Sequence, residues 1–258
     1  MSLRFVTSWA GNGNDCNGHG TYVAGTLGGR TFGVAKDLRI HALRVFGCSG
    51  SSPTSTITKA VDWVRANYVK PAVTNMSLGG GASDTLDKAV RNLTAAGVPV
   101  VVAAGNSNAD ANGQSPARVK EAITVGATDN TDTRAPFTCS SGQSNFGGVV
   151  DVFAPGDCIG SAWIGSDTDT GAISGTSMAA PHIAGMVARY LETDPYASPS
   201  AVSSLIIRNA TNGVVRTPGT GSPNRLLYTV LPKPMDQPKY GNFDFDDGGK
   251  EDILVQSA

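Results

Sequence analysis

Apolar residues recur along the chain in two alternating patterns. Strands are predicted at 38–46 and 72–78, and the apolar runs at 98–104, 122–127 and 149–153 are typical of strands covered on both faces. Apolar residues at helical spacing predict helices at 53–68, 83–96, 178–191 and 198–209. Because strands that alternate with helices are joined by right-handed crossovers, the pattern predicts an α/β fold with a mainly parallel sheet.

The composition narrows the class of protein without identifying it. The 258 residues are 40% hydrophobic and 16% charged, which excludes a disordered chain. A net charge of −1 provides no basic field for nucleic acid or anionic lipid. The longest apolar stretch, 95–105, is shorter than the roughly 20 residues that span a bilayer. We therefore expect no nucleic-acid partner and no membrane insertion.

The two ends differ from the middle of the chain. No secretory signal sequence precedes the loop-like segment 11–20. The segment 231–240 (LPKPMDQPKY) is rich in proline and predicts a linker, and 241–258 is too short to fold alone. The predicted organisation is a main domain at 1–230, a linker at 231–240 and the start of a further module at 241–258.

Three short segments carry the candidate chemistry. They are NGHGTYVAG around His19, VVAAGN ending at Asn106, and ISGTSMAAPH around Ser177. A nucleophilic serine needs an exposed hydroxyl and a base within reach, and a helix N-terminus favours developing negative charge. Asn106 could donate a further hydrogen bond to such an oxyanion. Pro181 is expected in the first turn of the helix at 178–191, where a missing N–H costs little.

Each segment alone also has an ordinary structural interpretation. A short Gly-x-Ser segment is most often a turn, a histidine beside glycine is more often structural, and asparagine after glycine is usually a turn residue. We interpret His41, in a predicted strand, and His182, in a predicted helix, as structural. The joint occurrence of all three segments, in this order and in one α/β chain, favours catalysis.

With the motifs GHGTYVAGT, NMSLGGG, VVAAGN and SGTSMAAPHIAG, the chain resembles the subtilisin-like serine proteases over about residues 5–230. The segments GVAKDLRIHALRVF, SPARVKEAITVGATD and DVFAPG are similar to the proteinase K branch, which includes aqualysin-like bacterial enzymes. The resemblance implies a three-layer α/β/α fold with a mainly parallel central sheet, missing its first strand or strands here. It implies a serine endopeptidase that acts on protein or peptide substrates, and we expect a monomer.

The same resemblance assigns roles to individual residues. His19 would be the general base, Ser177 the nucleophile that forms the acyl-enzyme, and Asn106 the oxyanion donor. Tyr22 stands where the family more commonly has histidine, and we expect little effect.

A substrate-binding edge is implied as well. Ser77, Leu78 and Gly79 would form an extended segment that pairs with the substrate backbone and lines the primary specificity pocket. Such an edge uses main-chain hydrogen bonds, which suits cleavage of varied sequences.

The family's third triad member has no counterpart in this sequence. It is an aspartate in an Asp-(Ser/Thr)-Gly motif upstream of the histidine, and the 18 residues before His19 contain no such motif. Asp15 lies nearby, but it sits in a glycine-rich loop and is not expected to replace it. Losing the aspartate lowers kcat by about 10⁴. We therefore expect a weakly active or inactive, N-terminally incomplete protease.

Two other functions share part of these sequence features. A non-catalytic pseudoprotease would use the cleft to bind peptides. An esterase of the α/β-hydrolase type is disfavoured, because that fold places its histidine long after the nucleophile, whereas His19 precedes Ser177 and His182 follows it too closely.

The four cysteines permit three pairings. Cys16 and Cys48 resemble a disulfide pair of aqualysin-like enzymes. Cys139 and Cys158 flank a predicted strand and are expected to form a second bridge that is not the family's usual one, with free buried cysteines as the alternative. Disulfides and the family together predict an extracellular, secreted protein.

Calcium is the only expected cofactor. By the resemblance, Asp151 with the carbonyls of Lys120 and Ala122 falls where proteinase K-like proteins hold Ca²⁺, which needs six to eight oxygens. No cofactor is expected for catalysis. The tail 241–258 resembles the calcium loop of integrin-type propeller repeats, although Gly248 stands where an aspartate is expected. An acidic, solvated chain end is the alternative for the tail.

Overall fold

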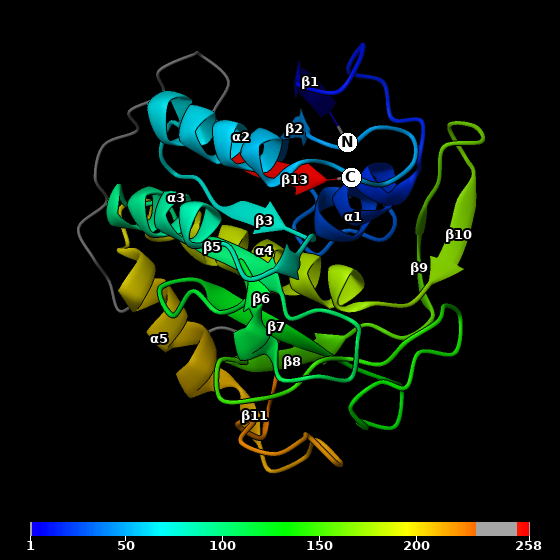
Figure 1. Cartoon of the computed structure of the whole chain (residues 1–258), viewed down its shortest axis with the longest axis vertical. Helices are drawn as coiled ribbons and strands as arrows, with labels where there is room; N and C mark the ends of the chain where they lie inside the picture. Colours follow the sequence, from blue (N-terminus) through cyan, green and yellow to red (C-terminus); the bar gives the residue numbers. More distant parts are fainter. Residues whose placement is uncertain (1, 231–251, 258) are drawn as a thin grey trace.

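The computed structural model describes residues 2–230 and 252–257. Five α-helices lie in this part of the chain and flank a central sheet (Figure 1). They are α1 His19–Gly28, α2 Thr54–Asn67, α3 Asp84–Ala95, α4 Thr176–Leu191 and α5 Pro199–Asn209. One 3₁₀ turn, Ala111–Gly113, follows strand β5 (Val100–Ala103) in the sequence.

The central sheet has nine strands in the order β1-β2-β13-β3-β5-β7-β8-β12-β11. Every neighbouring pair is parallel except β11 with β12. The strands are β1 Ser2–Ser8, β2 Arg39–Arg44, β13 Asp252–Ser257, β3 Thr74–Met76, β5 Val100–Ala103, β7 Ile123–Thr128, β8 Val152–Pro155, β12 Arg225–Leu226 and β11 Thr211–Asn212. The predicted mainly parallel sheet is confirmed.

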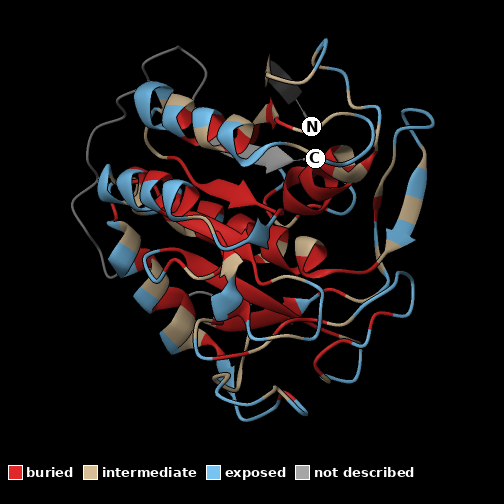
Figure 2. Cartoon of the chain, in the orientation of Figure 1, coloured by how far each residue is buried: buried red, intermediate tan, exposed pale blue. Residues whose placement is uncertain are grey.

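Two hydrophobic cores lie on opposite faces of this sheet. Side chains alternate along a strand, so Val101 and Ala103 of β5 join a core with α1, α4 and α5, while Val100 and Val102 join a second core with α2 and α3. Figure 2 shows strands β3, β5 and β7 and the inner faces of the helices as buried, with exposed residues on the outer helix faces, in the loops and on the small outer strands. The three layers follow from this alternation.

Most predicted elements are present, with shorter bounds. Ser83 caps α3 as expected, because its Oγ accepts the Leu86 N–H at 3.4 Å, and Gly97 follows the helix at φ 101°. The sequence patterns did not indicate the antiparallel hairpin of β9 Ile159–Ala162 and β10 Thr170–Ile173. A second small pair joins β4 Gly80–Gly81 to β6 Gln114–Ser115.

Pro181 lies further inside its helix than the sequence suggested. Helix α4 begins at Thr176, so the residue at 181 would ordinarily donate its N–H to the carbonyl of Ser177. Proline has no N–H, and the Ser77 hydroxyl donates to that carbonyl instead, at 2.8 Å. The expected first-turn position was therefore wrong. Because the proline leaves the Ser177 carbonyl free, Ser77 can form a hydrogen bond to it from a distant part of the chain.

The last described strand, β13, stands in the middle of the sheet. It pairs in parallel with β2 on one side and β3 on the other. We expected 241–258 to begin a separate repeat after a linker at 231–240; the structure instead places Asp252–Ser257 in the central sheet, while 231–251 lie outside the described residues. The place between β2 and β3, where the sheet would otherwise be interrupted, is thus filled from the far end of the chain.

Candidate active site

Ser177 is presented at the start of α4 by a tight turn. Gly175, which precedes the helix, has φ 158° and ψ 161°, and its N–H donates to the Gly156 carbonyl at 2.8 Å. Residue φ values in this region favour glycine, so the turn explains the glycine two positions before the serine. The Ser177 hydroxyl donates to the Ser77 carbonyl at 3.4 Å, a long hydrogen bond that leaves it available.

Asn106 lies beside this turn, and its amide has a fixed orientation. The backbone N–H and the hydroxyl of Thr176 donate to Asn106 Oδ1 at 2.9 and 2.8 Å. Because the oxygen is held by these two donors, Nδ2 is the group left to donate elsewhere. A Cβ built on Gly175 would lie 3.5 Å from Asn106 Nδ2, so the amide faces the turn that carries Ser177. The Thr176 hydroxyl also accepts the Gly105 N–H at 3.0 Å.

His19 is the first residue of α1, and α1 runs parallel to α4. The Tyr22 hydroxyl accepts the N–H of Ile173, just before α4, at 3.2 Å. Further along, a Cβ on Gly185 would lie 3.3 Å from the Leu27 carbonyl. Leu27 is eight residues after His19, and Gly185 is eight after Ser177. His19 and Ser177 therefore start two packed helices at the same end.

The imidazole of His19 is buried, and one of its two ring nitrogens lacks a hydrogen-bond partner among the described residues. Among the described residues, none hydrogen-bonds to its Nδ1. Burial lowers the pKa of His19, and the negative charge of Asp15 only partly opposes this. The neutral ring is therefore favoured at neutral pH, as a general base requires. The described residues contain no hydrogen bond between His19 and Ser177, and such catalytic contacts are often long without substrate.

Asp15 acts as the cap of α1. Oδ1 accepts the N–H groups of Asn17 and Gly18 at 2.9 and 2.8 Å, and Oδ2 accepts the N–H and hydroxyl of Thr21 at 2.8 Å. Burial raises the pKa of Asp15, but these four donors outweigh burial and lower it overall. Both oxygens are engaged by the loop and the helix start, so Asp15 fixes the backbone around His19 and does not hold its ring.

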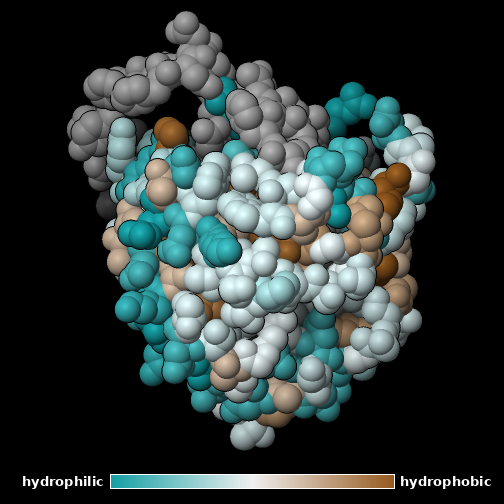
Figure 3. Space-filling model, turned by 45° about the horizontal axis from the view of Figure 1, so that its top comes forward, coloured by the Kyte–Doolittle hydropathy of each residue, from teal (hydrophilic) through white to brown (hydrophobic). Residues whose placement is uncertain are grey.

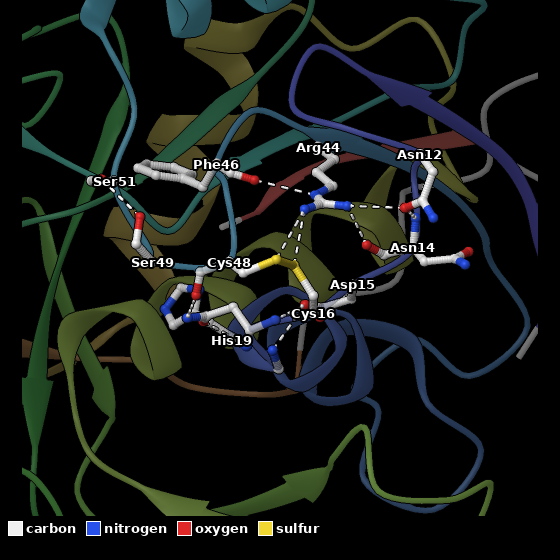
Figure 4. Close-up of a disulfide and its surroundings, with 12 residues drawn as sticks. Asn12, Asn14, Asp15, Cys16, His19, Arg44, Phe46, Cys48, Ser49 and Ser51 are labelled. Atoms are coloured by element: carbon white, nitrogen blue, oxygen red, sulfur yellow. Dashed lines mark hydrogen bonds between the residues drawn. A yellow bond between two sulfur atoms is a disulfide. The ribbon is translucent and has the colours of Figure 1, made fainter.

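A disulfide closes the loop around His19 (Figure 4). Cys16 and Cys48 are bonded, and the Arg44 guanidinium lies against the bridge, with Nη2 2.9 Å from Cys16 Sγ. Arg44 also donates from Nε to the Phe46 carbonyl at 3.2 Å. The bridge and Arg44 together join the His19 loop to the end of β2.

The predicted substrate-binding segment leaves β3 next to Ser177. Ser77 is buried, accepts a hydrogen bond from Asn75 Nδ2 at 3.0 Å and contacts the Ser177 carbonyl as described above. Leu78 is buried, and Gly79 is exposed. Beyond them, Gly80–Gly81 pairs with Gln114–Ser115, which gives the segment an extended backbone.

The residues expected to bind calcium lie elsewhere, at the amino ends of β7 and β8. Asp151 precedes β8; its N–H donates to the Thr124 carbonyl and its Oδ2 accepts the Thr124 N–H at 2.8 Å. Burial raises the pKa of Asp151 to about 6, against the hydrogen bond from Thr124 and the charge of Arg225. The described residues contain no cluster of three or more His, Cys, Asp or Glu side chains suited to a metal. Lys120 and Ala122 precede β7 and could offer only carbonyls.

The remaining sequence predictions have clear outcomes. Both disulfides form, Cys16–Cys48 and Cys139–Cys158, and free cysteines do not occur. His182 Nδ1 hydrogen-bonds to the Met178 carbonyl within α4 at 2.8 Å, and burial lowers its pKa. The sequence analysis assigned no role to Thr176, whose backbone N–H and hydroxyl orient the Asn106 amide.

A family model, the subtilase family, matches residues 7–227. The chain belongs to the subtilase family. This subtilase is 57% identical over 219 residues to the extracellular serine proteinase of Thermus sp. (strain Rt41A), a match that covers 85% of this chain and 52% of that relative. It is 52% identical over 217 residues to alkaline serine exoprotease A of Vibrio alginolyticus, covering 84% and 39%.

The fold comparison agrees. The subtilase matches the crystal structure of a cold adapted subtilisin-like serine proteinase with a TM-score of 0.82 at 46% identity, covering 89% of this chain and 82% of that one. The predicted subtilisin-like α/β fold is therefore confirmed. The chain spans about half the length of the Thermus relative and less of the Vibrio relative.

Proposed function

We propose that this subtilase is a serine endopeptidase with Ser177 as nucleophile, His19 as general base and Asn106 as oxyanion donor. One observation carries the proposal: Thr176 holds Asn106 Oδ1 with two hydrogen bonds, which directs Nδ2 toward the turn that presents Ser177. The parallel start of α1 and α4 adds His19 to the same end. The relatives named as serine proteinases support the same reaction.

The chemistry follows from these positions. His19, neutral because burial lowers its pKa, takes the Ser177 proton as Oγ attacks the peptide carbonyl. The oxyanion accepts hydrogen bonds from Asn106 Nδ2 and from the Ser177 N–H at the positive end of α4. His19 returns the proton to the leaving amine, and water then hydrolyses the acyl-enzyme by the reverse proton path.

Substrate would lie along Ser77–Gly79. This extended segment is next to Ser177, and backbone pairing would present the scissile carbonyl to Oγ without selecting one sequence. We propose protein or peptide chains as substrates on this basis.

The lack of a hydrogen-bond partner for His19 Nδ1 among the described residues determines how fast we expect this chain to hydrolyse peptides. With no carboxylate bonded to it among the described residues, neither the tautomer nor the imidazolium is supported. An orienting aspartate contributes about 10⁴ in kcat in serine proteases of this mechanism. We therefore propose weak hydrolysis by this chain. The same observation favours the second candidate function, peptide binding without turnover.

A fluorophosphonate probe separates the two functions. The probe should label Ser177, located by mass spectrometry of the digested adduct, and Ser177→Ala should abolish labelling. Ser166→Ala, at the exposed tip of the β9–β10 hairpin, is the matched control and should label normally. A folded protein that binds peptide but is never labelled would contradict the endopeptidase and support the binding function.

We also propose that the protein acts outside the cell as a monomer. The Thermus relative is named extracellular, and two disulfides lie in the described structure. In the residues that the structure describes, no helix has the length and apolarity to cross a membrane. Figure 3 shows a mainly hydrophilic or neutral face with hydrophobic side chains in separate spots, which is usual for a monomer.

Calcium binding near Asp151 is a further proposal. The residues fit a cation held by one carboxylate, the carbonyls of Lys120 and Ala122, and water: burial raises the pKa of Asp151, and the charge of Arg225 offsets this only in part. A bound cation would supply further positive charge and stabilise the amino ends of β7 and β8. No catalytic step depends on it.

This proposal gives a pH-dependent prediction for stability. A carboxyl with a pKa of about 6 in the folded state and an ordinary pKa of 3.8 when unfolded binds its proton more tightly when folded, so without metal the fold loses stability as pH rises from about 4 to about 6. The loss is at most about 3 kcal/mol. Asp151→Asn should abolish this pH-dependent loss of stability. Millimolar Ca²⁺ should restore the lost stability in the parent protein and have no such effect on Asp151→Asn.

Urea unfolding at pH 4 to 8, in a Ser177→Ala background that prevents autolysis, measures both effects. Asp167→Asn, an exposed acid in the β9–β10 hairpin, is the control and should leave the pH dependence unchanged. Equal calcium responses of Asp151→Asn and its parent would contradict the site.

A further inference from the structure

Ser174, three residues before Ser177, is a buried serine at the centre of a hydrogen-bond cluster whose other members are partly or fully exposed. Its Oγ accepts the backbone N–H groups of Cys139 at 3.1 Å and Cys158 at 2.9 Å, and it donates to Asp157 Oδ1 at 2.6 Å. A hydroxyl has one proton and two lone pairs, so these three bonds use its full capacity. Ser174 therefore has one arrangement available to it.

Asp157 completes the cluster as an ionised acceptor. Besides Ser174, it accepts the N–H and the hydroxyl of Thr138, each at 2.7 Å. Burial raises the pKa of Asp157, and the donors from Ser174 and Thr138 outweigh it, so the pKa is lowered. The carboxylate is charged over the range in which proteases work, and bonds to a charged acceptor are among the stronger ones.

A disulfide closes the same cluster covalently. Cys139 and Cys158 are bonded to each other, and both of their N–H groups donate to the one oxygen of Ser174. Cys158 has φ 49°, a left-handed conformation that is uncommon outside glycine and needs support from its surroundings. The bridge holds the two donors at the separation that a single acceptor requires. The Ser174 N–H in turn donates to Ser140 Oγ at 3.0 Å.

The three residues before the nucleophile are each held by hydrogen bonds to residues that lie far from them in the sequence. Ser174 is held by this cluster, the Gly175 N–H donates to the Gly156 carbonyl, and Thr176 holds Asn106. The second and third anchors belong to the site already described. In the part of the chain that the structure describes, the first makes no hydrogen bond to Ser177, Asn106 or the substrate-binding segment, and it holds the chain directly before the turn.

We infer that Asp157 and Ser174, held together by the Cys139–Cys158 bridge, are positioning residues that set the entry of the Ser177 turn and so the alignment of its hydroxyl with Asn106. The inference rests on the proposed function of Ser177. Because alignment within the site affects bond formation and these residues do not touch substrate, their loss should lower kcat and leave KM unchanged.

The test compares three variants at the cluster with one control variant in the β9–β10 hairpin, which lies between Asp157 and Ser174 in the sequence. Asp157→Ala and Ser174→Ala should lower kcat for a fluorogenic peptide, and the rate constant for fluorophosphonate labelling, about 10-fold or more. Asp157→Asn keeps an oxygen acceptor for Ser174 and should restore the rate to within about threefold of the parent. Asp169→Ala removes an acid that accepts the Gly165 N–H at the far end of the hairpin, and it should have no effect on kcat.

The bridge provides an independent arm. Cys139→Ser with Cys158→Ser should lower the labelling rate as Asp157→Ala does, with near-normal far-ultraviolet circular dichroism. If Asp157→Ala fails to fold, Ser174→Ala, which removes one hydroxyl, decides the matter.

The outcomes are distinct. A parent protein that is never labelled contradicts the proposed function itself. A labelled parent with cluster variants that react at the parent rate overturns the positioning role. A fall in kcat that Asp157→Asn does not restore, or that only matches a fall in folded fraction, overturns it as well.

Discussion

Asn106→Leu is expected to lower kcat for peptide hydrolysis about 10²- to 10³-fold, with little change in KM. Removing one oxyanion donor has this effect in subtilisin, a member of the same family, so the magnitude is taken from that enzyme. The physical reason is that Nδ2 meets the oxygen only after it has become charged. The amide contributes little to substrate binding before the reaction. Removing it therefore changes KM little and lowers mainly kcat.

Two controls keep this prediction specific. Asn112→Leu alters an exposed asparagine in the adjoining 3₁₀ turn and should leave kcat unchanged. Thr176→Val removes the hydroxyl that helps to orient the Asn106 amide and should give a smaller loss, because the Thr176 N–H still holds Oδ1. A folded Asn106→Leu protein with the parent kcat would show that no oxyanion forms beside this residue.

Ile183→Ala is expected to destabilise the fold by about 2–5 kcal/mol, measured by urea unfolding in the Ser177→Ala background. Ile183 lies on α4 in the core that α1, α4 and α5 form with the sheet, and its side chain is fully buried. The substitution removes apolar area from that core and leaves a cavity that close-packed neighbours fill only in part. Because α1 and α4 carry His19 and Ser177, the rate of fluorophosphonate labelling should fall with stability when Ile183→Ala is made in the protein that keeps Ser177.

A matched isoleucine tests whether burial is the cause. Ile164 is 39% exposed in the β9–β10 hairpin, and Ile164→Ala should cost less than 1 kcal/mol. Equal destabilisation by the two substitutions would contradict the assignment of Ile183 to the core.

The spacing of apolar residues was sufficient to predict the layers of strands and helices, because it reflects the repeat of each element and needs no knowledge of distant contacts. The run at 98–104 could be identified as a strand covered on both faces, since its apolar residues are consecutive, and the structure divides them between two cores. Helix α3 was predictable because Ser83 and Gly97 are local start and stop signals. The β9–β10 hairpin lacks alternation and a two-residue turn signal, so no local pattern indicated it.

The site divides in the same way. His19, Asn106 and Ser177 lie in motifs specific enough for a resemblance, and the structure brings all three to the α1/α4 end of the sheet. The cluster around Ser174 joins residues far apart along the chain, and Asp15 accepts hydrogen bonds from residues two to six positions after it without any regular spacing. Such contacts leave no periodic trace, so the sequence showed an acid and a serine without their partners.

The sequence by itself determined the alternation of strands and helices, the glycine-bounded positions of His19 and Ser177, and the family to which the chain belongs, because helix and strand periods and turn chemistry are local properties. Only the tertiary structure decided which strand fills the place between β2 and β3, that Thr176 orients Asn106, and that His19 Nδ1 has no partner among the described residues. These depend on which distant segments meet when the sheet assembles, and that is set by packing over the whole fold.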